Sequence, residues 1–124
     1  MKPTICIIED DLAVRESQRL MLELHGYCVE EFEDGARFLA RGRFDNVLCI
    51  ILDVNLPGES GLQILSRLRA RAIATPTFIV TGRADAGVRR EAKRLEVLAL
   101  FEKPLPAREL LAAVATIGAA PANS

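Results

Sequence analysis

Short apolar segments alternate along the chain with longer segments in which apolar residues recur at helical spacing. Apolar runs of about four to eight residues are typical of strands buried on both faces, and the longer pattern is typical of amphipathic helices. Five segments are predicted strands: 4–8, 27–32, 47–52, 77–81 and 97–101. A helix is predicted after each strand, and the five helices begin near Val14, Asp34, Ser60, Ala86 and Pro106.

Several of these helices carry recognised boundary signals. Ser60 and Gln63 form the Ser-x-x-Gln pattern of a capping box, and Pro106 suits the first position of a helix. Gly26 and Gly118 are expected to end the first and last helices. Alternation of strands and helices over short loops predicts an α/β fold, in which helices cover both faces of a parallel sheet.

Length and composition fit one globular domain. The chain has 124 residues, of which 50% are hydrophobic, and its net charge is −1. This composition excludes a disordered chain and argues against a protein that binds nucleic acid by charge alone. No segment approaches the roughly 18 apolar residues of a membrane span, and the N-terminus lacks the pattern of a signal peptide. We therefore expect a cytoplasmic protein without membrane contact.

The cysteines and the C-terminal segment carry no expected function of their own. Cys6, Cys28 and Cys49 are odd in number, far apart and set in apolar runs. We expect all three to be buried thiols in a reducing compartment, with no metal or disulfide role. The segment 119–124 has no periodicity, so we expect a domain over 1–118 followed by a linker or disordered tail.

Residues that carry chemistry follow four of the five predicted strands. Because the carboxyl ends of parallel strands lie along one edge of a sheet, we expect these residues to meet there. They are Glu9, Asp10 and Asp11 after the first strand, Asp53 after the third, Thr81 and Gly82 at the fourth, and Lys103 and Pro104 after the fifth.

At least three carboxylates therefore converge on one small area. Unpaired carboxylates repel one another, and a divalent cation removes that repulsion. Oxygen ligands without nearby histidine or cysteine favour Mg²⁺, or Mn²⁺ in its place, over Zn²⁺. Lys103 adds a positive charge and Thr81 a hydroxyl, so the set suits a phosphoryl group with a carboxylate as nucleophile. Capping of the following helix would account for Asp10 or Asp11, but not for the whole set.

Seven short motifs follow one another along the chain: Ile7-Ile8-Glu9-Asp10-Asp11, Gly26-Tyr27, Asp34-Gly35, Leu52-Asp53-Val54-Asn55-Leu56-Pro57-Gly58, Gly61-Leu62, Val80-Thr81-Gly82 and Lys103-Pro104. With these motifs in this order and at these spacings, the chain resembles the receiver domain of bacterial two-component response regulators from Thr4 to about Ile117. The resemblance implies a flavodoxin-like, doubly wound (βα)5 three-layer sandwich, whose five-stranded parallel sheet has the order 2-1-3-4-5.

The same resemblance implies a role for each site residue. Asp53 would be the phospho-acceptor, Lys103 would pair with the phosphate, and Thr81 would be the switch hydroxyl. The implied ligands of Mg²⁺ are Glu9, Asp10, Asp53 and the backbone carbonyl of Asn55. Asn55 and Arg83 occupy positions that tune the lifetime of the phosphate in the family. The other positions implied in switching and tuning are Gly82, Leu100, Phe101 and Pro104, and the Lys103-Pro104 bond is cis in the family.

The resemblance also implies partners. The phosphodonor would be a sensor histidine kinase or a phosphotransfer protein that presents a phosphohistidine. No enzyme activity is implied beyond the domain's own aspartyl phosphorylation and dephosphorylation. The expected output face combines the fourth helix, fifth strand and fifth helix, where a second copy or an output domain would bind. We do not expect this domain itself to contact nucleic acid.

Two regions depart from the family pattern. Leu100 lies where the family usually carries an aromatic residue, three positions before Lys103. Phe101 is adjacent, but successive strand residues face opposite sides of the sheet. The ring of Phe101 therefore takes the place of an aromatic side chain at position 100 only if the strand has a bulge or a register change. Glu96-Val97 stands where the family usually has Gly-Ala, and Gly87 weakens the fourth helix. We therefore expect this second region to be mobile or distorted.

Three alternative functions use parts of the same pattern. A haloacid-dehalogenase-like phosphatase places an aspartate two residues after its nucleophile, where this chain has Asn55, which does not transfer a proton. A flavodoxin-like flavin binder needs a Ser/Thr-rich loop where this chain has the acids Glu9-Asp10-Asp11. A receiver-like interaction domain with phosphorylation-independent switching stays open because of Leu100, although the set of acids, threonine and lysine argues against it.

Overall fold

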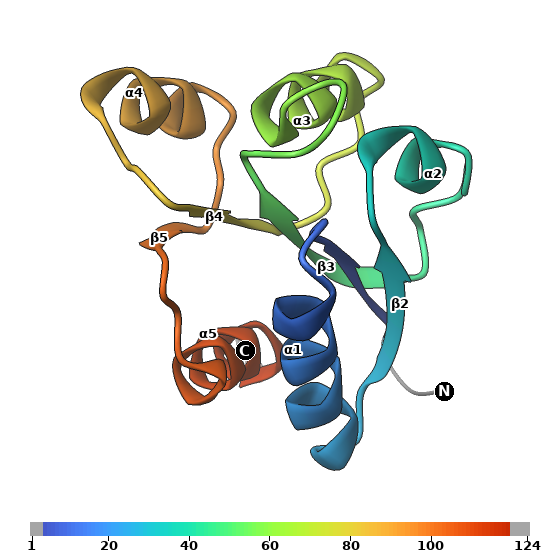
Figure 1. Cartoon of the computed structure of the whole chain (residues 1–124). Coiled ribbons are helices and arrows are strands. Elements are labelled where there is room, and N and C mark those ends of the chain that lie inside the picture. Colours follow the sequence, from blue (N-terminus) through green and yellow to red (C-terminus); the bar gives the residue numbers. More distant parts are fainter. Residues whose placement is uncertain (1–3, 120–124) are drawn as a thin grey trace.

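Five parallel strands form one sheet, in the order β2-β1-β3-β4-β5, in the computed structural model, which describes residues 4–119 (Figure 1). The strands are β1 (Thr4–Ile8), β2 (Cys28–Phe32), β3 (Val47–Asp53), β4 (Thr77–Thr81) and β5 (Ala99–Glu102). The helices are α1 (Leu12–Leu24), α2 (Gly35–Leu39), α3 (Gly61–Ala70), α4 (Ala86–Arg94) and α5 (Ala107–Ala119). The predicted fold class and strand order are confirmed.

Helices cover both faces of the sheet, with α1 and α5 on one face and α2, α3 and α4 on the other (Figure 1). Alternate residues of a central strand enter opposite layers, so that Ile5 and Ile7 pack toward α1 and α5 while Cys6 and Ile8 pack toward α2 and α3. This two-sided burial is the reason that β1 and β3 read as unbroken apolar runs.

Side chains of the loop residues begin four of the helices. Asp11, Asp34, Ser60 and Asp85 each accept a hydrogen bond from a backbone N–H in the first turn of the helix that follows. Gln63 returns a side-chain bond to the backbone of Ser60, which confirms the predicted capping box. These caps start the helices at the carboxyl-end edge of the sheet, where the chemically active residues also lie.

The region between α4 and β5 differs from the prediction in where the strand starts, and it also tests the expected distortion of α4. The strand begins at Ala99 rather than at Val97, because Glu96 has a φ of +58° and the Val97 N–H still bonds to the carbonyl of Ala92. The helix itself is regular from Ala86 to Arg94, so the expectation of distortion is wrong for α4. The expectation of mobility stays a prediction.

The cysteines differ from one another in exposure. Cys6 and Cys49 are buried, and burial raises the pKa of both thiols to about 12. Cys28 is exposed, which corrects the prediction that all three are buried. Cys28 is the first residue of β2, which lies at an edge of the sheet. The short apolar run that contains Cys28 is therefore exposed at this position.

Two further predictions concern the whole chain. Within residues 4–119, no helix has both the length and the apolar character needed to cross a bilayer. Of the predicted tail 119–124, only Ala119 belongs to the described residues, as the end of α5, and the rest lies outside them.

The close approach of α3 to β3 depends on Gly61. A Cβ atom added at Gly61 would lie 2.1 Å from the carbonyl oxygen of Asp53, whereas one at Gly87 would meet only a side-chain oxygen of Asp85 at 3.5 Å. We therefore expect Gly61→Ala to lower the free energy of unfolding by about 3 kcal/mol. The control Gly87→Ala should raise it by about 0.5–1 kcal/mol, because alanine favours the helix. Urea titration followed by circular dichroism measures both, and equal effects would contradict the packing described.

Candidate functional site

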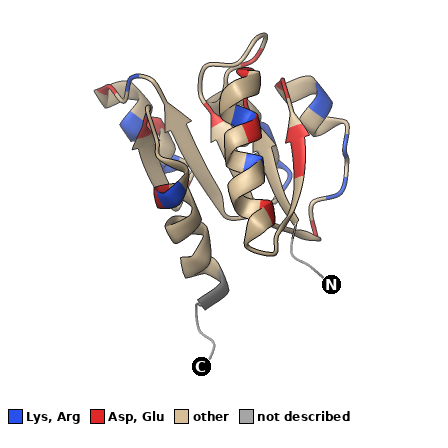
Figure 2. Ribbon diagram, turned by 60° about the horizontal axis from the view of Figure 1, so that its bottom comes forward, with Lys and Arg blue, Asp and Glu red and all other residues tan. Residues whose placement is uncertain are grey.

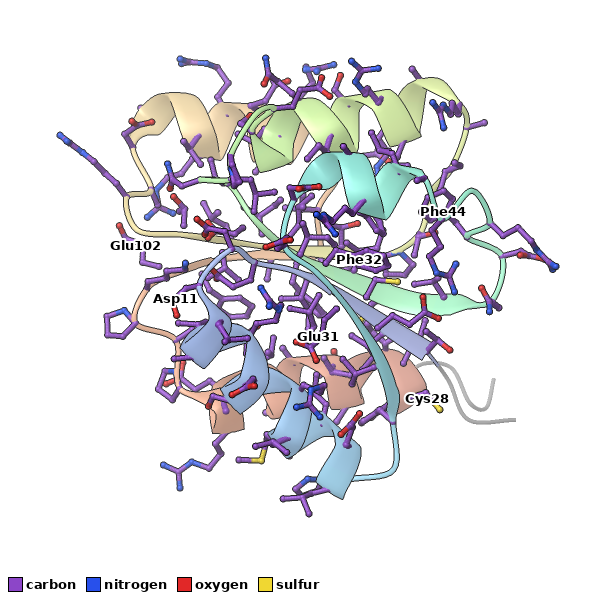
Figure 3. All side chains as sticks on the ribbon, turned by 45° about the vertical axis from the view of Figure 1, so that its right-hand side comes forward. Asp11, Cys28, Glu31, Phe32, Phe44 and Glu102 are labelled. Atoms are coloured by element: carbon purple, nitrogen blue, oxygen red, sulfur yellow. The ribbon has the colours of Figure 1, made fainter. Side chains whose placement is uncertain are left out.

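Asp53, Glu9 and Lys103 meet at the carboxyl-end edge of the sheet. Asp53 ends β3, Glu9 follows β1, and Lys103 follows β5. The two carboxylate residues are 3% and 2% exposed, respectively. The Lys103 N–H donates to the carbonyl of Thr81 at 2.8 Å, and the Lys103-Pro104 peptide bond is cis, as the resemblance implied. Figure 3 labels Asp11, two residues after Glu9, and Glu102, directly before Lys103, and both lie far from Cys28.

The ammonium group of Lys103 lies between the two carboxylates. Its Nζ atom is 2.8 Å from Oδ2 of Asp53 and 2.8 Å from Oε1 of Glu9. The remaining oxygens accept backbone bonds: Asp53 Oδ1 from the Asn55 N–H at 2.9 Å, and Glu9 Oε2 from the Asp11 N–H at 3.1 Å. Every oxygen of the two buried carboxylates therefore has a donor, as buried charges require.

Burial and ion pairing shift the pKa values of Glu9 and Lys103 in opposite directions. Burial raises the pKa of Glu9, and the hydrogen bonds from Lys103 and the Asp11 N–H only partly offset that effect. Burial alone would lower the pKa of Lys103, but the bonds to Asp53 and Glu9 outweigh it and raise that pKa. The lysine is therefore charged at neutral pH.

Three carboxylates are close enough to share one cation. Glu9, Asp10 and Asp53 each offer an oxygen, and these oxygens all lie within 4.8 Å of one another. Asp10 is exposed while the other two are buried, so the group opens to solvent on the side of Asp10. An all-oxygen ligand set of this kind suits Mg²⁺ or Mn²⁺. Asn55 lies beside the group, because its N–H binds Asp53.

The hydroxyl of Thr81 is turned toward the loop between β4 and α4. Its Oγ1 accepts a hydrogen bond from the Arg83 N–H at 3.2 Å and lies 3.2 Å from the Arg83 carbonyl oxygen, to which it can donate. It is also 3.5 Å from Oδ1 of Asn55. Thr81 itself is buried, whereas Gly82 and Arg83 are exposed.

Two side chains outside the predicted set hold the same loop. Glu102 accepts a hydrogen bond from the Ala84 N–H at 3.0 Å, and Arg89 donates from Nε to the Ala84 carbonyl at 3.0 Å. An exposed acid and an exposed arginine carry no distinctive pattern in the sequence, so sequence reasoning missed both. Sequence reasoning also missed Arg15, a half-buried arginine of α1 that donates to the Glu9 carbonyl, because no motif marks it.

Leu100 and Phe101 point to opposite faces of the sheet, as predicted. The register of β5 on β4 is regular and pairs Ile79 with Leu100 and Val80 with Phe101. Leu100 packs in the layer of α3 and α4, whereas Phe101 packs in the layer of α1 and α5, with its ring centroid 6.0 Å from that of Phe78. Phe101 therefore does not occupy the position of Leu100.

Comparison with known proteins identifies a family over most of the chain. The family model described as "Response regulator receiver domain" matches residues 5–115. The chain is 38% identical over 108 residues to the transcriptional regulatory protein FixJ of Azorhizobium caulinodans, a match that covers 87% of this chain and 51% of FixJ. It is 33% identical over 112 residues to the response regulator MprA of Mycobacterium ulcerans, covering 90% of this chain and 48% of MprA.

A solved structure agrees with the fold. The receiver domain protein (CheY-like) from Methanospirillum hungatei JF-1 superposes with a TM-score of 0.88 at 24% identity, over 96% of each chain. At this identity the likeness shows the fold alone. The chain spans about half the length of the curated relatives that it matches, 51% of FixJ and 48% of MprA.

Replacing Lys103 by methionine is expected to destabilise the metal-free protein. The change leaves Asp53 and Glu9 facing each other without a cation, and we expect the free energy of unfolding to fall by about 2 kcal/mol. Added Mg²⁺ should restore part of this loss, because it binds the folded protein at the same carboxylates.

Urea unfolding in chelator and in Mg²⁺ measures both effects. Lys93→Met, on the exposed side of α4, is the matched control and should leave the stability nearly unchanged in either condition. Equal stability of the Lys103 and Lys93 variants in chelator would contradict the electrostatic account.

Proposed function

Because the chain belongs to the family of response regulator receiver domains, whose function is phosphorylation-based signalling in two-component systems, we propose that Asp53 is its phospho-acceptor. The single observation that carries this proposal is the pairing of a buried carboxylate with an ammonium group. Lys103 Nζ lies 2.8 Å from Asp53, and two further carboxylates lie within 4.8 Å. A nucleophile, a cation for the transferred group and ligands for a metal are thus in one place.

The transfer requires one carboxylate oxygen of Asp53 to attack phosphorus. In a phosphohistidine donor, the phosphorus–nitrogen bond breaks as the phosphorus–oxygen bond forms, and the ring nitrogen keeps the electron pair. The Asn55 N–H holds Oδ1 of Asp53 and Lys103 holds Oδ2, so the carboxylate is oriented before the donor arrives. Lys103 then neutralises charge on the phosphoryl oxygens.

Receiver domains bind Mg²⁺ at an acidic pocket, and this chain has an acidic cluster made of Glu9, Asp10 and Asp53. We infer that Glu9, Asp10, Asp53 and the backbone carbonyl of Asn55 hold Mg²⁺, or Mn²⁺ in its place. When bound, the ion supplies positive charge to the transferring oxygens. The all-oxygen chemistry of the described cluster supports this assignment.

Receiver domains act with histidine kinases or phosphotransfer proteins, and we propose that the donor contacts the surface beside Lys103. A cavity of about 570 Å³ lies there between α1 and the segment after β5, and its lining is mostly apolar. It is lined by Ala13, Val14, Ser17, Gln18, Val80, Lys103, Pro104, Leu105 and Ala107. We propose that a donor that brings a phosphohistidine to Asp53 covers this surface, whose apolar lining suits an apolar side chain of the partner.

Phosphorylation would change the contacts of Thr81. The phosphoryl group adds about 1.5 to 2 negative charges and three acceptor oxygens beside Asp53. We propose that the Thr81 hydroxyl leaves Arg83 for one of these oxygens and that the loop through Gly82 moves with it. Movement of that loop would alter the face formed by α4, β5 and α5, where a second copy or an output domain would bind.

The leucine at position 100 raises a second candidate function. Leu100 has no ring to change position with Thr81, so a receiver-like interaction domain with phosphorylation-independent switching is the alternative. Glu102 accepts a hydrogen bond from the Ala84 N–H and Arg89 donates one to the Ala84 carbonyl, which offers a route through the loop that does not need an aromatic residue. These bonds favour the phosphorylated switch.

Asp53→Asn tests the proposal directly. Wild-type protein incubated with acetyl phosphate and Mg²⁺ should gain the mass of one phosphoryl group, whereas Asp53→Asn should gain none, because the amide is not a nucleophile for phosphorus. Asp45→Asn, an exposed aspartate in a loop, is the control and should behave like wild type. No gain in wild type, or an equal gain in Asp53→Asn, would overturn the proposal.

Arg83 is expected to influence the lifetime of the phosphate. It follows Gly82 in the exposed loop after β4, and we propose that its long side chain shields the phosphoryl group from water. We expect Arg83→Ala to hydrolyse its phosphate about threefold faster, a small change in barrier. Phosphate release measured after removal of the donor gives the rate, with Arg90→Ala as the control, and an unchanged rate in Arg83→Ala would exclude this role.

A further inference from the structure

Arg15 of α1 links the acidic site to the neighbouring edge of the sheet. Its Nη1 donates to the carbonyl oxygen of Glu9 at 2.7 Å, and its Nε donates to Oε1 of Glu31 at 2.9 Å. The side chain is only 14% exposed. Figure 2 shows basic positions of α1 beside the acidic stretch of β2, and Figure 3 labels Glu31 on that strand.

The oxygen that Arg15 holds belongs to the peptide bond between Glu9 and Asp10. The Glu9 N–H still pairs with the carbonyl of Phe32, at 3.0 Å, but the chain leaves the sheet after it. The Glu9 carbonyl therefore lies just beyond the strand ladder, and Arg15 supplies its donor. Because a peptide group is planar, fixing its oxygen also fixes the direction in which the chain enters Asp10.

Asp10 depends on this backbone orientation more than its neighbours do. Glu9 and Asp53 are held through both oxygens of their carboxylates. Within residues 4–119, no hydrogen bond or ion pair holds the carboxylate of Asp10, which is exposed. Its oxygen nevertheless lies within 4.8 Å of ligand oxygens of the other two acids, so the backbone has to place it there.

We propose that Arg15 is a positioning residue for the cation site. It holds the peptide between Glu9 and Asp10 in the orientation that brings both carboxylates toward Asp53. Arg15 is anchored in turn by Glu31 of β2, so one side chain of α1 links the sheet edge to the acidic loop. The inference rests on the proposed function, because it concerns the same Mg²⁺ site.

Two effects of Arg15 on a cation oppose each other. Its positive charge repels a cation, so loss of that charge alone would tighten binding. Its hydrogen bond to the Glu9 carbonyl orients the ligands, so loss of that bond weakens binding. Arg19 separates the two effects, because it pairs with the same Glu31 and with Glu23 and, within the described residues, makes no hydrogen bond to Glu9.

Calorimetric titration of the unphosphorylated protein with Mg²⁺ tests the proposal. We expect Arg15→Met to raise the Kd for Mg²⁺ about tenfold, at the lower end of the range for residues that orient metal ligands. Arg19→Met should leave the Kd unchanged or lower it. Arg15→Lys, which keeps the charge and one donor, should fall between Arg15→Met and wild type.

A second measurement distinguishes positioning from damage to the acceptor. In phosphorylation by acetyl phosphate, Arg15→Met should need more Mg²⁺ for half-maximal rate, while its rate at saturating Mg²⁺ stays near that of wild type. Failure of Asp53 to accept a phosphoryl group would leave the calorimetric result standing, so the two proposals fail separately.

The proposal is wrong if Arg15→Met binds Mg²⁺ as wild type does, or if Arg19→Met loses as much affinity as Arg15→Met. Circular dichroism first establishes that the variants fold. If Arg15→Met does not fold, Arg15→Lys and Arg19→Lys decide the matter: a higher Kd in the Arg15 variant alone supports positioning, and equal values overturn it.

Discussion

Two carboxylates buried at the ends of neighbouring parallel strands repel each other unless a cation lies between them. Asp53 and Glu9 are such a pair, since Asp53 ends β3 and Glu9 directly follows β1, and Lys103 reaches them from beyond β5. The rest of the site is arranged around this contact, since backbone N–H groups bind the two remaining oxygens and Asp10 completes a cluster open to solvent. We propose that a metal ion or a phosphoryl group at this site changes how these charges are paired.

Hydrogen bonds to the backbone hold the loop between β4 and α4 beside this site. Thr81 binds the loop at Arg83, and Glu102 and Arg89 hold both sides of Ala84 in the same loop. Leu100 packs in the layer of α3 and α4, and its side chain has no polar group that could form a hydrogen bond. We interpret the loop between β4 and α4 as the element whose position depends on the state of Asp53.

The sequence predicts most of this arrangement for a physical reason. Strands buried on both faces leave unbroken apolar runs, and parallel topology then brings Glu9, Asp53 and Lys103 to one edge. What it does not predict depends on contacts between distant segments. Cys28 lies in an apolar run yet is exposed at the sheet edge, and the partners of Arg15 and Glu102 are set by how the loops fold. The start of β5 depends on a positive φ at Glu96, which no pattern around it indicates.

The central claim is that a phosphoryl group is carried by Asp53 and by no other carboxylate of the cluster. Borohydride reduces an aspartyl phosphate to homoserine, so reduction of the phosphorylated protein followed by peptide mass mapping locates the acceptor. The account predicts homoserine at position 53 in place of Asp53. A reduced residue at Glu9 or Asp10 instead, or no reduced residue after verified phosphorylation, would contradict it.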